Sequence, residues 1–280
     1  MLNPLRPHAL PIIPTPYLMS LKDTLVSPAI DAYVYHHFQK MVPWPGAAAT
    51  RAYCEWFGHS SAATRTALSR AKSQQHIHIE GSPPRIILGN TLKHQVNYYL
   101  RENFSDSSFS LIITHFSQDS DSERYRVKDL LTRLGYVKFT HNTYLRYGSN
   151  PAPVLEWLHQ QELSQYVYHF HPLEDIPHTL QSELASLYEL AKWRTVLKDY
   201  SDFLTAFLKQ TDLKSLEGYL SYLYVRSAFH KNIMTCAPFL PPRYFAEVTL
   251  LKDCYERLGT LAHTHMNSNL EHYCTFFGAD

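Results

Sequence analysis

Between Ser60 and Gln75 the chain carries small residues interrupted by hydroxyl and basic side chains. A helix that enters the major groove of duplex DNA needs small residues for close approach, and donors for base edges and phosphates. This run offers both, and its N-terminal N–H groups suit a phosphate. The expected DNA contacts are Ser61, Thr64, Arg65, Ser69, Arg70 and Lys72, joined by Arg85 from a following hairpin.

The same run also fits an ordinary amphipathic helix with a solvated polar face. Helical spacing predicts a buried side formed by Ala63, Ala67, Leu68 and Ala71. The opposite, exposed side is expected to carry Ala62, Arg65, Ser69 and Lys72. The pattern leaves both readings open.

Other arrangements that could do chemistry are sparse. The chain has 17 histidines, but the local pairs at 36–37, 169/171 and 263/265 imply no third metal ligand by spacing, so no metal site is expected. There is no Gly-x-Ser-x-Gly, no glycine-rich phosphate loop and no His-Glu-x-x-His, so no catalytic residues and no cofactor are expected. A nucleic-acid hydrolase remains an alternative, with Asp119 and Asp121 in the loop after a predicted strand.

The elements that position this run read as a winged helix-turn-helix over 28–104. Ser27-Pro28 predicts a helix start. A second helix over 47–57 ends at Gly58, where a left-handed residue fits, and Ser60 caps the third. The short strands IHIE and RIIL follow around the turn GSPP, and a further helix is predicted over 91–103.

The rest of the chain predicts two further domains, giving an α+β fold. Residues 105–172 read as β-α-β-β-α-β, the order of a ferredoxin-like domain. Residues 173–280 are helical, and their last helix is expected from about Phe245 to Phe276. Residues 1–27 are expected to form a proline-rich arm.

Composition narrows the class of protein. The hydrophobic fraction is 45%, ample for packed cores, and no uninterrupted apolar run reaches the ~18 residues that would span a membrane. Residues 1–104 carry ten basic and five acidic side chains, whereas residues 105–280 carry sixteen basic and twenty acidic ones. The positive charge of residues 1–104 favours a polyanionic partner. The four cysteines lack a Cys-x-x-Cys pair, and reduced thiols in a cytoplasmic protein are expected.

The motifs resemble a known family. The segment FGHSSAATRTALSRAKSQQHI, residues 57–77, is similar to the helix-turn-helix signature of the PaaX family of bacterial repressors of phenylacetic acid catabolism. LLTRLGYVKFTHNTYLRY, WRTVLKDYSDFL and the stretch from Arg226 to Leu258 resemble later family segments in the same order. The wing departs from the family, because Pro83-Pro84-Arg85-Ile86-Ile87 stands where a more basic strand is expected.

The resemblance implies a homodimeric transcriptional repressor that binds double-stranded DNA. The helix over 60–75 of each subunit would read half of a palindromic operator, with the two recognition helices about one turn of DNA apart. An aromatic acyl-CoA thioester would be the releasing effector rather than a cofactor. The alternative is a PaaX-like scaffold that acts as a protein-interaction module without sequence-specific DNA binding, which the sparsely charged wing favours.

Overall fold

The computed structural model describes residues 17–93, 96, 108–117, 120–147, 152–173, 178–234, 236–238 and 240–278. It is a mixed helix and sheet structure, which confirms the α+β class. The chain divides into two compact units: unit 1 comprises 1–97, 205–232 and 256–280, and unit 2 comprises 98–204 and 233–255. The expected arm over 1–16, most of the helix predicted over 91–103, and Asp119 lie outside the described residues.

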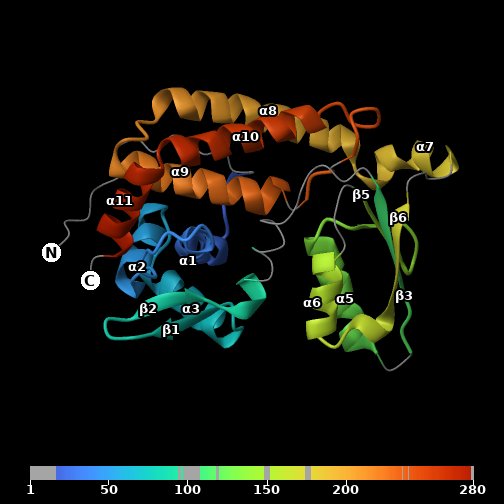
Figure 1. Cartoon of the computed structure of the whole chain (residues 1–280), viewed down its shortest axis with the longest axis horizontal. Helices are drawn as coiled ribbons and strands as arrows, with labels where there is room; N and C mark the ends of the chain where they lie inside the picture. Colours follow the sequence, from blue (N-terminus) through green and yellow to red (C-terminus); the bar gives the residue numbers. More distant parts are fainter. Residues whose placement is uncertain are drawn as a thin grey trace. The chain divides into compact units, whose positions relative to one another are not determined.

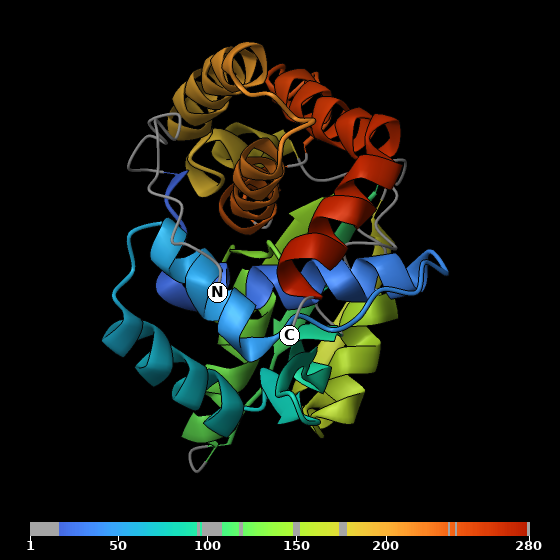
Figure 2. The same cartoon turned by 90° about the vertical axis from the view of Figure 1, so that its left-hand side faces the viewer.

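Unit 1 begins with three helices and a two-stranded antiparallel sheet. In chain order they are α1 (Leu21–His37), α2 (Ala47–Trp56), α3 (Ser61–Ser73), β1 (Ile77–Glu80) and β2 (Arg85–Leu88). Ile77, Ile86 and Leu88 are fully buried, so the hairpin packs its apolar side inward. Figures 1 and 2 both show α3 beside the hairpin, on the side of the unit away from α9 (Leu216–Phe229).

The first helix starts earlier than the sequence predicts. Ser20, not Ser27, is its N-cap: the Ser20 hydroxyl accepts the Asp23 N–H at 3.2 Å. Pro28 therefore lies inside the helix, where it cannot donate the usual backbone hydrogen bond. Ser27 is buried instead, with its hydroxyl 2.6 Å from that of Ser227 on α9. The predicted arm over 1–27 is wrong from residue 20 onward, because packing against α9 extends the helix.

Helices from the C-terminal third of the chain complete unit 1. The rings of Phe57 and Tyr224 stack at 4.2 Å, so α9 covers the end of α2. Tyr53 of α2 also meets Phe277 of α11 (Met266–Phe277), with ring centroids 5.6 Å apart. The expected separate helical domain over 173–280 is thus divided between the two units, because its aromatic side chains complete the core around the first helices.

A charged group is buried where α1 meets α9. Asp31 is 2% exposed, forms an ion pair with Arg226 and accepts a hydrogen bond from the Tyr219 hydroxyl at 2.8 Å. Burial lowers the pKa of Arg226 to about 10, and burial together with the charge of Arg226 lowers the pKa of His230 to about 4. His230 therefore stays neutral at pH 7, which leaves Arg226 as the cation that balances Asp31.

Unit 2 is built on a four-stranded antiparallel sheet in the order β4-β5-β3-β6. Figure 1 shows two of its helices, α5 and α6, on one side of this sheet. Their shared core includes Ile112, Leu131 and Leu158, all fully buried. The elements are β3 (Phe109–Thr114), α5 (Asp121–Arg133), β4 (Val137–Lys138), β5 (Thr143–Tyr147), α6 (Ala152–Gln160), a 3-10 turn (Ser164–Tyr166), β6 (Val167–Leu173) and α7 (His178–Leu187).

Two long helices and a π-helical turn each have some residues in unit 1 and the others in unit 2. They are α8 (Leu190–Gln210), α10 (Val248–Thr264) and the turn at His230–Met234. The long helix expected from Phe245 to Phe276 is instead two helices, because α10 ends at Thr264 and His265 is the N-cap of α11. No described helix is both long and apolar enough to cross a membrane.

Gly58, in the turn between α2 and α3, adopts φ +83°, as the sequence predicts. We expect Gly58→Ala to lower the free energy of unfolding by about 1 kcal/mol, because an L side chain is strained in the left-handed region even though nothing lies within 4 Å of its Cβ position. Gly259→Ala is the matched control: its Cβ position is equally open, but it lies inside α10. That change should stabilise by about 0.5–1 kcal/mol. Urea unfolding of both variants measures the difference, and equal effects would contradict it.

Candidate nucleic-acid interface

The α3 helix presents most of the predicted DNA contacts to solvent. Ser60 caps it as expected, its hydroxyl accepting the Ala63 N–H at 3.2 Å. One N–H of the first turn is therefore already bonded within the chain. Exposed side chains run along the whole outer face: Ser61, Arg65, Ser69, Arg70 and Lys72. The helix contains no carboxylate, so this face carries three positive charges and several hydroxyls.

Thr64 does not belong to that face. It is fully buried, and its hydroxyl donates to the Ser60 carbonyl at 3.0 Å. Its prediction as a DNA contact is wrong, because Thr64 and Ala71 form the inner side of the helix. Ala63, predicted to be buried, is exposed. The inner side thus includes Thr64 in place of Ala63, whereas Ala71 is buried as predicted and Ala67 and Leu68 are partly buried.

Arg85 forms hydrogen bonds within its own unit. The side chain is partly buried, and its guanidinium donates to the Trp44 carbonyl at 2.6 Å and to the Gly278 carbonyl at 3.2 Å. Arg85 therefore joins the hairpin to the α1–α2 loop and to the end of α11. Its role as a DNA contact stays a prediction. The hairpin tip at 81–84 is exposed and consists of glycine, serine and two prolines.

Two polar residues that the sequence reading did not select lie on the same face. Thr66 and Ser73 are exposed, and the Thr66 hydroxyl donates to the Ala62 carbonyl at 3.1 Å. Their spacing from Ser69 and Arg70 is the signal that could have found them, since residues three and four apart share a helix face.

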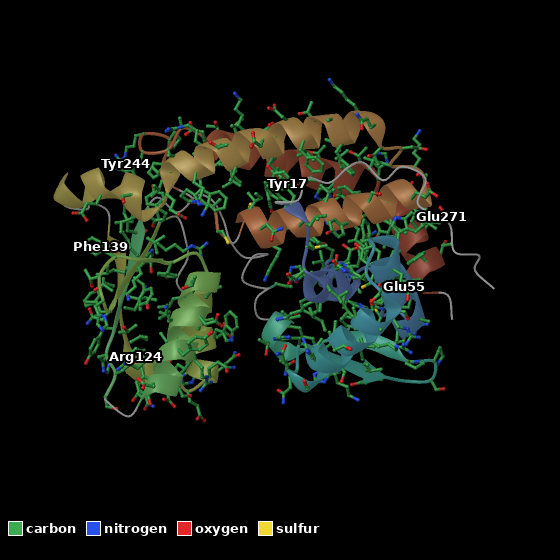
Figure 3. All side chains as sticks on the ribbon, turned by 180° about the vertical axis from the view of Figure 1, so that it is seen from behind. Tyr17, Glu55, Arg124, Phe139, Tyr244 and Glu271 are labelled. Atoms are coloured by element: carbon green, nitrogen blue, oxygen red, sulfur yellow. The ribbon has the colours of Figure 1, made fainter. Side chains whose placement is uncertain are left out.

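The elements that flank α3 carry two exposed carboxylates. Glu55 is exposed on α2, where Figure 3 labels it, and Glu80 is exposed at the end of β1. His59, in the turn before α3, is partly buried, and burial lowers its pKa below the ordinary value. His59 is therefore neutral at pH 7. The positive charge of this surface comes from Arg65, Arg70 and Lys72.

The described part of the chain contains one of the two carboxylates of the hydrolase alternative. No group of three or more His, Cys, Asp or Glu side chains suited to a metal ion occurs among those residues. Asp121, one of the two hydrolase candidates, is exposed at the first position of α5 and pairs with Arg124 at 3.0 Å. Asp119, the other, is not among the described residues.

No protein-family model matches the chain, and no curated protein matches it. Among solved structures, it is similar to the uncharacterized protein Rv0674 from Mycobacterium tuberculosis, with 11% sequence identity and a TM-score of 0.45 over 89% of this chain and 99% of that chain. A likeness at this level carries no argument about function.

Proposed function

We propose that this chain is a DNA-binding transcriptional regulator of the PaaX type, acting as a repressor. The observation that supports this best is the exposed face of α3, which carries three basic side chains and no carboxylate directly after a left-handed turn at Gly58. In this motif α2 would be the first helix and α3 the second, and helix-turn-helix proteins place the second helix in the major groove. The order α1-α2-α3-β1-β2 is that of a winged helix-turn-helix, and the strand order β4-β5-β3-β6 is that of a ferredoxin-like domain.

In this proposal each of the five predicted contacts exposed on α3 has a role set by its chemistry. Arg65 lies in the first half of α3 and presents a planar fork that fits the O6 and N7 atoms of guanine. Arg70 and Lys72, in the last turn, suit phosphates of the flanking backbone. Ser61 and Ser69 add short donors. Two copies of the chain would read the two halves of a palindromic operator, and an aromatic acyl-CoA would release them.

The test is capture of genomic fragments by the purified full chain, followed by titration of an enriched fragment at several salt concentrations. Because each neutralised phosphate releases counterions, the logarithm of the association constant should fall linearly with the logarithm of the salt concentration. Two phosphate contacts per subunit, from Arg70 and Lys72, would give a slope of about −4 for a dimer. No enriched sequence, or a flat salt response, would overturn the proposal.

A protein-interaction module is the second candidate, and the hairpin favours it. The exposed tip at 81–84 has no basic side chain, and Arg85 binds carbonyls of its own unit. A wing that contacts DNA ordinarily supplies cations to the backbone. The capture step separates the two candidates, since a module of this kind would bind DNA without sequence preference or not at all and would therefore enrich no fragment.

A further inference from the structure

The side chains that face most directly outward from α3 are all small. Each residue turns a helix by about 100°, so four exposed residues of α3 lie within about 60° of one another around its axis. These four residues, called the outer row below, are Ala62, Thr66, Ser69 and Ser73. By the same geometry the outer row lies opposite the buried residues Thr64 and Ala71.

Longer basic side chains flank the outer row on both sides. Arg65 and Lys72 lie on one side of it and Arg70 on the other, and the helix contains no carboxylate. The major groove of DNA is about 12 Å wide, close to the diameter of a helix with its side chains. Small side chains at the centre therefore let the helix backbone approach the base edges. The long side chains at the flanks can then reach the phosphates on the two walls of the groove.

Two members of the outer row bring methyl groups to the first half of α3. The side chain of Ala62 is itself a methyl group. The Thr66 hydroxyl donates to the Ala62 carbonyl at 3.1 Å, so its proton is already used within the helix. The methyl group of Thr66 therefore remains for contact with a base edge. The N-terminal residues of a recognition helix are those that contact base edges.

A methyl side chain in the major groove favours one base. The C5-methyl group of thymine is the apolar group that the groove presents, and alanine and threonine methyl groups fit against it. A methyl group placed over the amino group of cytosine or adenine would instead leave a hydrogen-bond donor without an acceptor, which weakens binding.

We propose that Ala62 and Thr66 contact the methyl groups of thymine, so that each half of the operator carries thymine close to the guanine proposed for Arg65. The inference rests on the proposed function, because it names further bases that the same helix reads. It makes Ala62 and Thr66 residues that determine specificity, whereas Arg70 and Lys72 contribute affinity.

The experiment uses the full chain and a DNA fragment enriched by the genomic capture. Each thymine of the two half-sites is replaced in turn by deoxyuridine, which lacks only the C5-methyl group and keeps the hydrogen bonds of the base. Binding should weaken about fourfold at one or two positions of each half-site, the change expected when one apolar carbon is no longer buried. Replacement of thymines outside the half-sites is the control and should have no effect. Fluorescence anisotropy at fixed salt measures the affinities.

Thr66→Ser makes the matching change in the protein, because serine lacks the methyl group but keeps the hydroxyl that bonds to the Ala62 carbonyl. It should weaken binding to the native fragment about fourfold. On the fragment with deoxyuridine at the contacted position it should cause no further loss, because the two changes remove the same contact. Thr132→Ser is the matched control: Thr132 is exposed on α5, and its hydroxyl donates to the Lys128 carbonyl at 2.8 Å in the same way. This control should leave affinity unchanged.

The outcomes separate this inference from the proposed function. An enriched fragment whose binding is unchanged by every deoxyuridine and by Thr66→Ser would overturn the thymine contacts and leave α3 as a DNA-reading helix. Losses from deoxyuridine and from Thr66→Ser that add at every position would overturn the contact with Thr66. A failure to enrich any fragment would overturn the proposed function and this inference together.

Discussion

Replacing Arg65 by alanine should weaken binding to an enriched DNA fragment by about ten- to a hundred-fold, with no loss of folding. The expected size follows from the 1–3 kcal/mol that a bidentate contact from arginine to a guanine contributes. Arg65 is exposed on α3, so its removal leaves no buried cavity and no unpaired partner inside the protein. Fluorescence anisotropy at one fixed salt concentration measures the change, and circular dichroism checks the fold.

Two further variants make this result specific. Lys252→Ala removes an exposed positive charge from α10 and should leave affinity unchanged within about twofold. Arg65→Lys retains the charge but not the fork, so it separates base reading from phosphate binding. If Arg65 reads a base through its fork, the lysine variant should bind more weakly than the native protein, because an ammonium group does not reproduce the planar pair of donors. Equal affinity of Arg65→Ala and Lys252→Ala would rule out α3 as the reading helix.

Replacing Arg226 by methionine should destabilise unit 1 by about 3–5 kcal/mol, because it leaves the buried carboxylate of Asp31 without its cation. The hydrogen bond from the Tyr219 hydroxyl to Asp31 would remain, but one bond from an uncharged donor does not balance a buried negative charge. Urea unfolding followed by tryptophan fluorescence would show the transition at lower denaturant. The double variant Arg226→Met with Asp31→Leu should regain much of the loss, since no charge then stays buried.

An exposed ion pair provides the control. Lys192 and Glu189 lie 2.7 Å apart with both side chains 60% exposed, so Lys192→Met should change stability by less than about 1 kcal/mol. The contrast tests burial rather than charge, because both substitutions remove one cation. Similar transitions for Arg226→Met and Lys192→Met would show that Asp31 is solvated in the native protein.

Local signals account for the parts of the candidate interface that were predicted correctly. The α3 helix begins after Ser60 because a hydroxyl can cap it, and the preceding turn needs Gly58 because its φ is +83°. Both depend on residues close in sequence. Thr64 was assigned to the wrong side, since alanine and threonine are both small enough to lie against a neighbouring helix. The inner side is decided by what packs there.

The start of α1, by contrast, could not be predicted from residues close in sequence. Taken locally, Ser27-Pro28 favours a helix start, yet the helix begins at Leu21 and buries Ser27 against Ser227, two hundred residues later in the chain. Arg85 is a second case, because its side chain binds the carbonyls of Trp44 and Gly278, which no spacing rule connects to it. Contacts of this range depend on the whole tertiary structure.

The amino-acid sequence by itself determined the α+β class, the order of the elements and the cap and turn that frame α3. These features follow from the spacing of apolar residues, from the residues that cap helix ends and from the backbone conformations that each residue prefers, all of which act over a few residues. Only the tertiary structure decided that α9 and α11 complete the first unit, that Asp31 and Arg226 are buried together, and that Thr64 lies on the inner side of α3. Each of these depends on side chains distant in sequence meeting in a core, where burial changes their energies.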